Sequence, residues 1–487
     1  MKRAVSRLVV SVAIGIGVVD FVLLVLVVVR RPYTEIDWIA YMEQVKQAFE
    51  NNERDYARIH GRTGPLVYPA GFLWIYYLLY RWTNGGTLRT RAQVAFAALH
   101  ALGVALTCAV YQIATLDLDM ERDRPSVAKP QRSARFLAPT SIGLIAALLV
   151  ALSSRRVASI FVLRLFNDGV ESVLMQASVL FFVIARSRSH SGQHIRHQWL
   201  MDVIACLLYS MAVSVKMNAL LYAPAVLVLL WEAHGFLQTL IYLVGVCGSW
   251  QLVIGWRFLR QHPWSYLRKA FEFGRVFDQR WSVNFACLPE HVFVHPCWAA
   301  LLLTLHVLAL ALFGVRAGVP LWLRCRPSEN AESRVNAFRT ALLLWSSNLI
   351  GMAFARSLHY QFLAWVWWSS PFIALADWMM AVELFRPRVD LMAIGWRLVP
   401  VLLIELVFNR YPPKCWASVV LHIAHACLLV RVWATVARWR RRDEQTPQRR
   451  PVYGQPRPGM DDERQSMYVP ERAAAERRQR PGVAATK

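Results

Sequence analysis

The sequence predicts an all-α membrane protein, a polytopic helical bundle with about 12 spans. Hydrophobic residues make up 56% of the 487 residues and Trp occurs 20 times, which is more apolar surface than one soluble core of that length requires. The apolar residues form stretches of bilayer-spanning length. The dense polar and aromatic clusters between these stretches fall almost entirely on one side of the predicted membrane, as in a membrane enzyme.

The candidate spans begin with an apolar segment that has a short basic start. Arg30, Arg31 and Pro32 follow it in place of a small-residue cleavage site, so we predict an uncleaved signal anchor. The apolar stretch 65–82 has two interpretations: a further crossing, or a Tyr- and Trp-rich interfacial helix on the membrane surface. The crossing would move the basic loop 117–136 to the far side from the N-terminus, so we predict the interfacial helix. The spans are 8–29, 92–116, 137–152, 165–185, 199–215, 219–231, 237–258, 292–314, 338–356, 362–383, 394–409 and 415–436.

Positive charge distinguishes the two sides of this bundle. The segments 31–91 and 259–291 lie on the far side from the termini, and the Arg residues of 259–291 break the positive-inside tendency, which we interpret as a sign of function. Residues 1–438 form one membrane domain, followed by a disordered basic tail over 439–487. Both termini are predicted to be cytosolic, because they share a side with the basic loops 117–136, 186–198, 315–337 and 384–393.

The net charge of +24 does not indicate a nucleic-acid partner, because the Arg residues lie in loops and in the tail. Topology and anionic lipid explain the charge better. The eight Cys residues are scattered without a CxxC pair, so neither a metal site nor a disulfide framework is predicted, although Cys287 and Cys297 could lie close together. The segment 117–119 resembles a DxD metal motif, but it lies in a predicted cytosolic loop. No metal or cofactor is predicted.

Two carboxylates, Glu35 and Asp37, directly follow the first span. A glycosyl transfer that inverts the anomeric centre needs one carboxylate as general base, which typically contributes about 10² to 10⁴ in rate. The alternative is that Asp37 caps a helix over 38–50, and spacing alone favours the cap. The Pro- and Gly-rich segment 63–71 predicts a shaped turn, either at the border of an acceptor groove or only leading into the interfacial helix.

Ionisable and amide side chains lie at the external ends of two spans. Arg164, Asn167 and Asp168 lie at one, and Lys216 and Asn218 at the other. Such groups are costly there unless they are paired or face a cavity, so they are candidate substrate-binding residues. The alternative is a structural ion pair of Asp168 with Lys216 or Arg164.

Two further clusters suit the recognition of phosphate. Arg356, His359 and Tyr360 lie between two spans, where they are expected to grip a lipid phosphate, unless His359 is only an interfacial hydrogen-bonding residue. The segment 271–285 interleaves polar residues with Phe and Trp, and Arg is suited to forked contacts with phosphate oxygens. Its alternative is an amphipathic surface helix. The candidate residues of this segment are Arg275, Asp278, Gln279 and Arg280.

Six ordered blocks over residues 33 to about 375 carry a specific resemblance: YTEIDW, TGPLVYPAG, RLFNDG, SVKMNALLY, FEFGRVFDQRWSVNF and SLHYQF. They resemble the endoplasmic-reticulum family of dolichyl-phosphate-mannose-dependent alpha-1,3-mannosyltransferases, which add the sixth mannose to the dolichol-diphosphate-linked pentamannosyl oligosaccharide. The resemblance implies a GT-C type bundle in the endoplasmic reticulum membrane, with a long first luminal loop and the active site in the lumen. It implies no metal.

The same resemblance implies residue roles. Asp37 would be the general base, with Glu35 as second choice. Arg356 and His359 would stabilise the departing dolichyl phosphate, with help from Lys216 and from Arg275 and Arg280. The competing interpretations are a related lipid-donor mannosyltransferase with another acceptor, and a lipid or sugar transporter. Transport is disfavoured, because transporters place such groups near mid-membrane and often show repeated halves.

Overall fold

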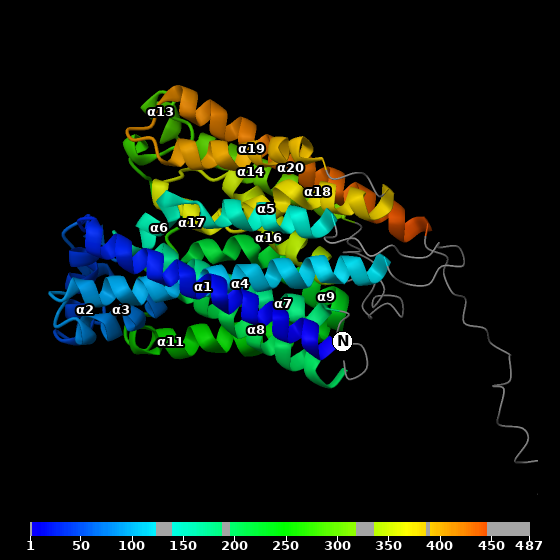
Figure 1. Cartoon of the computed structure of the whole chain (residues 1–487). Coiled ribbons are helices and arrows are strands. Elements are labelled where there is room, and N and C mark those ends of the chain that lie inside the picture. Colours follow the sequence, from blue (N-terminus) through cyan, green and yellow to red (C-terminus); the bar gives the residue numbers. More distant parts are fainter. Residues whose placement is uncertain (1, 123–138, 188–194, 318–335, 386–389, 446–487) are drawn as a thin grey trace, which may run out of the picture. The chain divides into compact units, whose positions relative to one another are not determined.

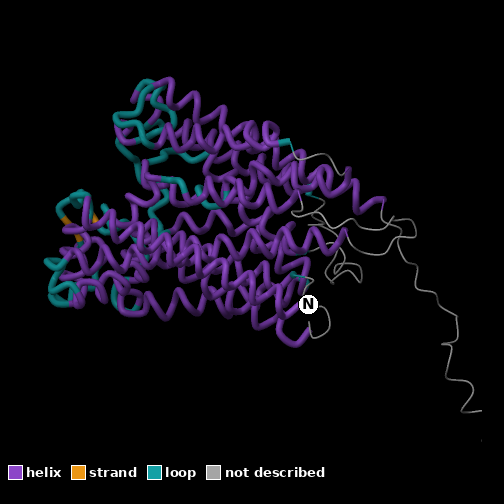
Figure 2. The backbone as a smooth tube through the Cα atoms, in the orientation of Figure 1, coloured by secondary structure: helices purple, strands orange, loops and turns teal. Residues whose placement is uncertain are grey.

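The computed structural model describes residues 2–122, 139–187, 195–317, 336–385 and 390–445. Most of this part of the chain is helical, and its loops gather mainly at one end of the bundle (Figure 2). The predicted polytopic helical bundle is therefore confirmed. Most of the basic loops assigned to the cytosol, and residues 446–487 of the predicted tail, lie outside the described residues. The last helix extends to Gln445, beyond the predicted start of the tail at 439.

A helix or a run of helices lies at every predicted span (Figure 1). One predicted span, 237–258, is built from α10 (Phe236–Leu240), a π-helical segment (Ile241–Gly248) and α11 (Ser249–Leu259). The others are α1 (Lys2–Arg30), α4 (Arg89–Arg122), α5 (Pro139–Leu152), α7 (Asn167–Arg186), α8 (Ile195–Val215), α9 (Ala223–His234), α14 (Pro296–Arg316), α16 (Ala337–Ala353), α18 (Ser370–Phe385), α19 (Leu391–Phe408) and α20 (Cys415–Gln445).

The number of crossings is smaller when length and apolarity are both required. Nine helices in the described part of the chain meet both conditions, or ten if the bent pair formed by α5 and α6 (Arg155–Val162) is one span. Helices α16 and α18 have 17 and 16 residues, so they fall just below the required length of 18 residues. Because α16 is buried from residue 337 to residue 352, it lies inside the bundle and not at its surface.

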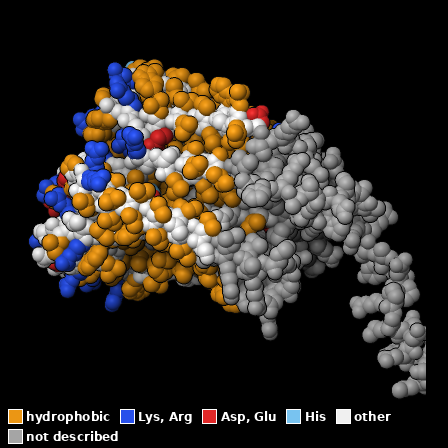
Figure 3. Space-filling view, in the orientation of Figure 1, with side chains coloured by type: hydrophobic (Ala, Val, Ile, Leu, Met, Phe, Trp, Pro, Cys, Tyr) orange, Lys and Arg blue, Asp and Glu red, His pale blue; other side chains and the backbone are white. Residues whose placement is uncertain are grey.

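Lipid-facing and interior surfaces are clearly separated. Helix α14 buries only Leu302 and Phe313, so nearly all its apolar side chains point outward, as expected of a helix in contact with acyl chains. Orange apolar side chains cover much of the visible side of the bundle in Figure 3, and Lys and Arg gather at the end that carries α2 and α3. Helices α7 and α16, in contrast, bury most of their residues.

The segment after α1 forms a small external layer. It contains α2 (Trp38–Phe49), a 3-10 turn (Tyr56–Arg58), the two-stranded hairpin β1 (His60–Gly61) and β2 (Gly64–Pro65), and α3 (Ala70–Trp82). The 13 residues of α3 rise about 20 Å, which is short of a hydrocarbon core of roughly 30 Å. This length favours the interfacial interpretation of 65–82. Figure 1 shows α2 and α3 at the same end of the bundle as α6 and α17 (Leu363–Val366).

The absence of disulfides was a wrong prediction. Cys287 in the loop 259–291 is bonded to Cys415 at the start of α20, with their Cα atoms 4.4 Å apart. Cys297, which could have lain close to Cys287 on the sequence alone, is free and exposed. The two bonded residues are 128 positions apart, and proximity along the chain gives no signal for such a pairing.

Loss of this bond is expected to destabilise the external loop. The double variant Cys287→Ser/Cys415→Ser should lower the free energy of unfolding by about 2–4 kcal/mol, because the reduced chain gains entropy when unfolded. Thermal unfolding of the purified protein in detergent measures this. Cys297→Ser removes an exposed free thiol from the same end and should leave the Tm unchanged; equal Tm values for wild type and double variant would contradict the prediction.

Candidate active site

Asp37 lies at the N-terminus of α2, but its side chain does not cap the helix. Glu35 performs that role, since its Oε1 accepts a hydrogen bond from the backbone N–H of Ile39 at 3.1 Å. The Glu35 carboxylate also lies 3.8 Å from Arg89. The interpretation of Asp37 as a cap is therefore wrong: Glu35 is engaged in structure, and Asp37 remains available for chemistry.

The surroundings of Asp37 make its carboxylate a stronger base than usual. Burial raises the pKa of Asp37 above its ordinary value, while the Thr63 hydroxyl and Lys216 act in the opposite direction and Asp168 adds to the rise. The interactions show that three separate blocks of the sequence meet here: the first external segment, the start of α7 and the end of α8. A base with a raised pKa accepts a proton from a hydroxyl more readily than an ordinary Asp does.

Asp168 and Lys216 form a buried ion pair next to this carboxylate. The Lys216 Nζ donates to Asp168 Oδ1 at 2.8 Å and lies 3.4 Å from Asn167 Oδ1. Trp365 Nε1 donates to the same Asp168 oxygen at 2.6 Å. The ion pair that the sequence offered as an alternative therefore forms, and its partner is Lys216 rather than Arg164. Asn218, predicted beside Lys216, is buried on the 3-10 turn that follows it.

Aromatic rings surround the Lys216 ammonium. Its Nζ lies 5.4 Å from the centroid of Tyr68, 5.1 Å from that of Phe362 and 5.3 Å from that of Trp365. Such contacts stabilise a desolvated cation. The turn 63–71 therefore contributes a ring to the site through Tyr68, in addition to leading into α3.

Several polar atoms in this cluster have no partner. Asn167 Nδ2 and Asp168 Oδ2 are buried and make no hydrogen bond within the described residues. Buried polar groups are normally satisfied, so unpaired ones mark a place where a ligand or water completes the site. Both atoms belong to residues singled out from the sequence as substrate-binding candidates.

Two arginines lie against the ring of Tyr360. The guanidinium carbon of Arg156 lies 5.0 Å from the ring centroid, and that of Arg164 lies 5.6 Å from it. Arg164 also donates to the Ser159 hydroxyl. The Nε atoms of Arg156 and Arg164 are buried and find no acceptor among the described residues. Two guanidinium groups in this arrangement are suited to binding a phosphate.

Arg156 is a candidate site residue that was not singled out from the sequence. It lies on α6, the short helix that follows the bend of 46° after α5. The backbone N–H of Arg156 donates to Glu405 Oε1 at 3.2 Å, and the Ser154 hydroxyl donates to Glu405 Oε2 at 2.7 Å, which ties α6 to α19. The available signal was the Arg155-Arg156 pair between two apolar stretches, on the predicted external side, where the positive-inside tendency does not expect it.

The loop 259–291 uses most of its predicted site residues for its own structure. Asp278 pairs with Arg280 at 2.7 Å, and the Arg280 side chain is 69% exposed. Gln279 Nε2 donates to the carbonyls of Phe285 and Leu288. Asp278, Gln279 and Arg280 are thus engaged in contacts within their own loop, and their predicted role in substrate binding stays a prediction.

His359 and Arg275 lie close enough to influence each other. Burial, together with the charges of Lys216 and Arg275, lowers the pKa of His359 to about 4. His359 is therefore neutral at physiological pH, so it can offer a phosphate a hydrogen bond but not a positive charge, and its role in the site stays a prediction. Arg356 Nη2 donates to the Val294 carbonyl at 3.0 Å, so that guanidinium is partly committed to the backbone.

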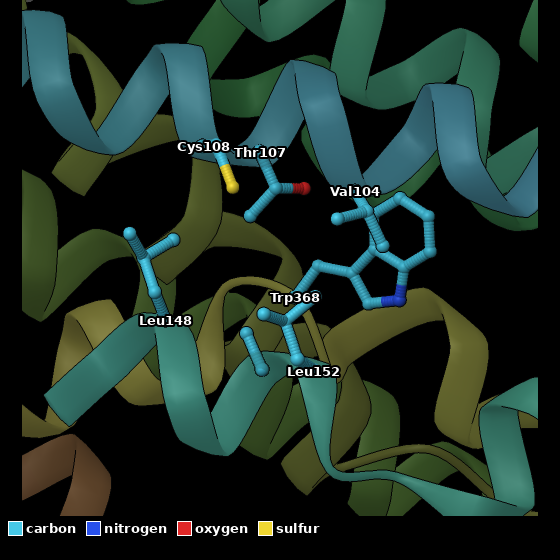
Figure 4. Close-up of a pocket in the computed structure, with 7 residues that line it drawn as sticks. Val104, Thr107, Cys108, Leu148, Leu152 and Trp368 are labelled. Atoms are coloured by element: carbon cyan, nitrogen blue, oxygen red, sulfur yellow. The ribbon is translucent and has the colours of Figure 1, made fainter. Parts of the chain in front are cut away.

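A separate apolar pocket lies deeper in the bundle, between α4 and α5 (Figure 4). Trp368 closes one side of it, and none of its lining side chains is charged. It lacks the groups that glycosyl transfer requires, so the polar cluster around Asp37 is the candidate active site. The lining residues are Val104, Thr107, Cys108, Leu148, Ala151, Leu152 and Trp368.

Comparison with known proteins places the chain in a family. A family model described as "ALG3 protein" matches residues 14–418. The chain belongs to the ALG3 protein family. This ALG3-family chain is 35% identical over 414 residues to a Mus musculus protein named Dol-P-Man:Man(5)GlcNAc(2)-PP-Dol alpha-1,3-mannosyltransferase, covering 84% of this chain and 83% of the mouse protein.

Proteins of the same name from other organisms are similarly close to this ALG3-family chain. The Homo sapiens protein is 35% identical over 423 residues, covering 84% of this chain and 83% of the human one. The Arabidopsis thaliana protein is 34% identical, covering 86% of this chain and 87% of the plant one. Among solved structures, the crystal structure of ArnT from Cupriavidus metallidurans bound to undecaprenyl phosphate is similar to this chain, with 12% identity and a TM-score of 0.37. The match covers 89% of this chain and 76% of the ArnT chain. This TM-score is too low to transfer a residue or a ligand from ArnT.

Proposed function

We propose that this chain is an inverting mannosyltransferase of the endoplasmic reticulum membrane. It transfers mannose in alpha-1,3 linkage from dolichyl-phosphate mannose to the dolichol-diphosphate-linked pentamannosyl oligosaccharide, in agreement with the names of its relatives. The observation that carries the proposal is the Asp37 carboxylate, which is free of the helix cap and raised in pKa by burial. It lies at the end of the bundle where the other polar site groups gather.

The reaction needs one proton acceptor. A hydroxyl of the acceptor mannose attacks the anomeric carbon of the donor while Asp37 takes the hydroxyl proton. The bond between the anomeric carbon and the phosphate oxygen breaks, and dolichyl phosphate leaves with the electron pair. Attack from the face opposite to the leaving phosphate inverts the anomeric centre.

The departing phosphate needs positive charge that is not already neutralised. Lys216 is paired with Asp168, so its positive charge is already largely neutralised by the protein. Arg156 and Arg164 retain unpartnered Nε atoms and lie over the same ring, which supports them as the main phosphate ligands. The unpartnered Asn167 Nδ2 and Asp168 Oδ2 are suited to sugar hydroxyls.

The proposed orientation places the active site in the lumen and both termini in the cytosol. The disulfide between Cys287 and Cys415 supports it, since such bonds persist in oxidising compartments such as the endoplasmic reticulum lumen. Cys287 belongs to the same external loop as Arg275, whose charge acts on His359 in the site.

Arg156→Gln is expected to weaken use of the lipid donor. Hydrogen bonds to charged groups contribute about 1.5–3 kcal/mol, so kcat/KM for dolichyl-phosphate mannose should fall by roughly 10- to 100-fold. Steady-state kinetics with saturating acceptor measures this. Arg155→Gln is the matched control, because Arg155 is exposed on the same helical turn; equal losses in the two variants would contradict a specific role for Arg156.

The pH dependence of catalysis should reflect the ionisation of Asp37. Because burial raises its pKa, the acidic limb of kcat/KM should have its midpoint above 3.8, with activity lost as pH falls through that midpoint. The Thr63 hydroxyl hydrogen-bonds the carboxylate and lowers its pKa, so Thr63→Val should move the limb to higher pH. A pH–rate profile of both proteins tests this, and an unshifted or opposite limb in Thr63→Val would argue against Asp37 as the titrating base.

The donor class is tested with purified protein and labelled sugar. We expect transfer of one mannose from dolichyl-phosphate mannose to the pentamannosyl lipid and none from a nucleotide-linked mannose. Transfer only to a different lipid-linked acceptor would favour a related mannosyltransferase of the same donor class. Failure with every lipid-linked donor and acceptor, from protein with normal thermal unfolding, would contradict the proposal.

A further inference from the structure

A cluster of three arginines surrounds one carboxylate far from the candidate active site. Asp377 on α18 lies 3.1 Å from Arg397 on α19, 3.7 Å from Arg431 on α20 and 3.7 Å from Arg438 on α20. The Asp377 side chain is only 8% exposed. The cluster thus joins three helices through a single acidic group.

The charges in this cluster do not balance. The three arginines make no other ion pair within the described part of the chain, so one carboxylate faces three positive charges. Arg397 also donates a hydrogen bond to the backbone carbonyl of Ala393, and Arg438 donates one to the backbone carbonyl of Asp377. The buried Arg431 Nε has no acceptor among the described residues. Excess cationic charge within spans is costly unless an anion compensates it.

The position of the cluster along the helices places it in the opposite half of the bundle from the active site. Helix α20 begins at Cys415, which is bonded to the external loop. Arg431 lies about 24 Å further along α20 and Arg397 lies about 12 Å from Glu405, the residue that holds α6, at the usual rise per residue. Arg438 is the last residue of the candidate span Cys415–Arg438.

The arginines are open to the membrane-facing surface. Arg397 and Arg431 are each 23% exposed and Arg438 is 31% exposed. Trp396 and Val430, their neighbours along α19 and α20, are each 67% exposed and face outward. A cationic opening between outward apolar side chains at the end of a span is where a lipid headgroup lies, with its acyl chains against the apolar flank.

We propose that Arg397, Arg431 and Arg438 bind the phosphate of an anionic phospholipid in the leaflet opposite to the active site, with Asp377 holding their side chains in place. The phosphate supplies the missing negative charge and an acceptor for Arg431 Nε. The proposal does not depend on the sugar that the enzyme transfers.

Native mass spectrometry of the full chain tests lipid retention directly. The protein is exchanged into detergent with phosphatidic acid or with phosphatidylcholine, and bound lipid is counted. Wild type should retain phosphatidic acid, and Arg397→Gln/Arg431→Gln should bind it roughly 30-fold more weakly, from the loss of two arginines at the membrane surface. This double variant keeps the pair of Asp377 with Arg438, so no buried carboxylate is left unpaired.

Two controls separate lipid binding from structure. Arg316→Gln removes one charge from α14, where Arg316 lies 5.1 Å from the ring centroid of Trp433 on α20, and should weaken retention by no more than about fivefold, against roughly 30-fold in the double variant. Arg431→Lys keeps the charge and should restore most of the binding lost in Arg431→Gln. Unchanged retention of phosphatidic acid in the double variant, at a Tm equal to that of wild type, would overturn the proposal. Displacement of the lipid by millimolar inorganic phosphate would overturn its assignment to a membrane lipid.

Discussion

Asp37→Asn is expected to lower kcat by about 10² to 10⁴ while leaving the protein folded and membrane-inserted. The amide cannot accept the proton from the attacking hydroxyl, and no capping hydrogen bond is lost, because the Asp37 side chain makes none. Single-turnover transfer from dolichyl-phosphate mannose measures the chemical step. Circular dichroism and thermal unfolding in detergent establish that the variant is intact.

Glu35→Gln is the matched control for this experiment. Glu35 caps α2 through Ile39, so its loss should cost roughly 1 kcal/mol of stability and far less activity than the loss of Asp37. If Glu35→Gln abolished transfer and Asp37→Asn turned over at a near-normal rate, the two roles would have to be exchanged.

Asp168→Ala should destabilise the protein by about 3–5 kcal/mol, because it leaves the Lys216 ammonium buried without its counter-charge. The Trp365 indole N–H loses its acceptor as well. Chemical unfolding followed by Trp fluorescence measures the change. A variant as stable as wild type would show that the Lys216 charge is compensated in another way.

The double variant Asp168→Leu/Lys216→Met distinguishes a structural pair from a binding one. Replacing a buried ion pair by apolar residues of similar volume is often neutral for stability, so most of the loss should be recovered. If Asp168 also binds a sugar hydroxyl, the activity of this double variant should stay low even though its stability is recovered. Recovery of both stability and activity would assign the pair to structure alone.

Helix positions were well predicted, because continuous apolar stretches are a strong local signal. The meeting of Asp168 with Lys216 was also accessible, since charged groups at the mouths of spans need partners. The number of crossings was less accessible, because α16 and α18 have only 17 and 16 residues and composition alone does not decide whether such short apolar helices cross the membrane.

The wrong predictions concern contacts between residues that only the folded structure brings together. The cap of α2 comes from Glu35, two residues before the position that the sequence pattern favoured. The disulfide joins Cys287 to Cys415 across most of the C-terminal half. Arg156 lies over the ring of Tyr360 because the chain bends after α5, and the sequence does not show this bend. In each case the residue type was apparent in the sequence, but its partner was set by packing.

The most direct test of the proposed function is the linkage of the product. Purified protein is incubated with dolichyl-phosphate mannose and the pentamannosyl lipid in the presence of a chelator, and the glycan is released and analysed by methylation and by linkage-specific mannosidases. We predict a single added mannose in alpha-1,3 linkage, absent with Asp37→Asn. A different linkage, or the same product from Asp37→Asn at the wild-type rate, would contradict the account.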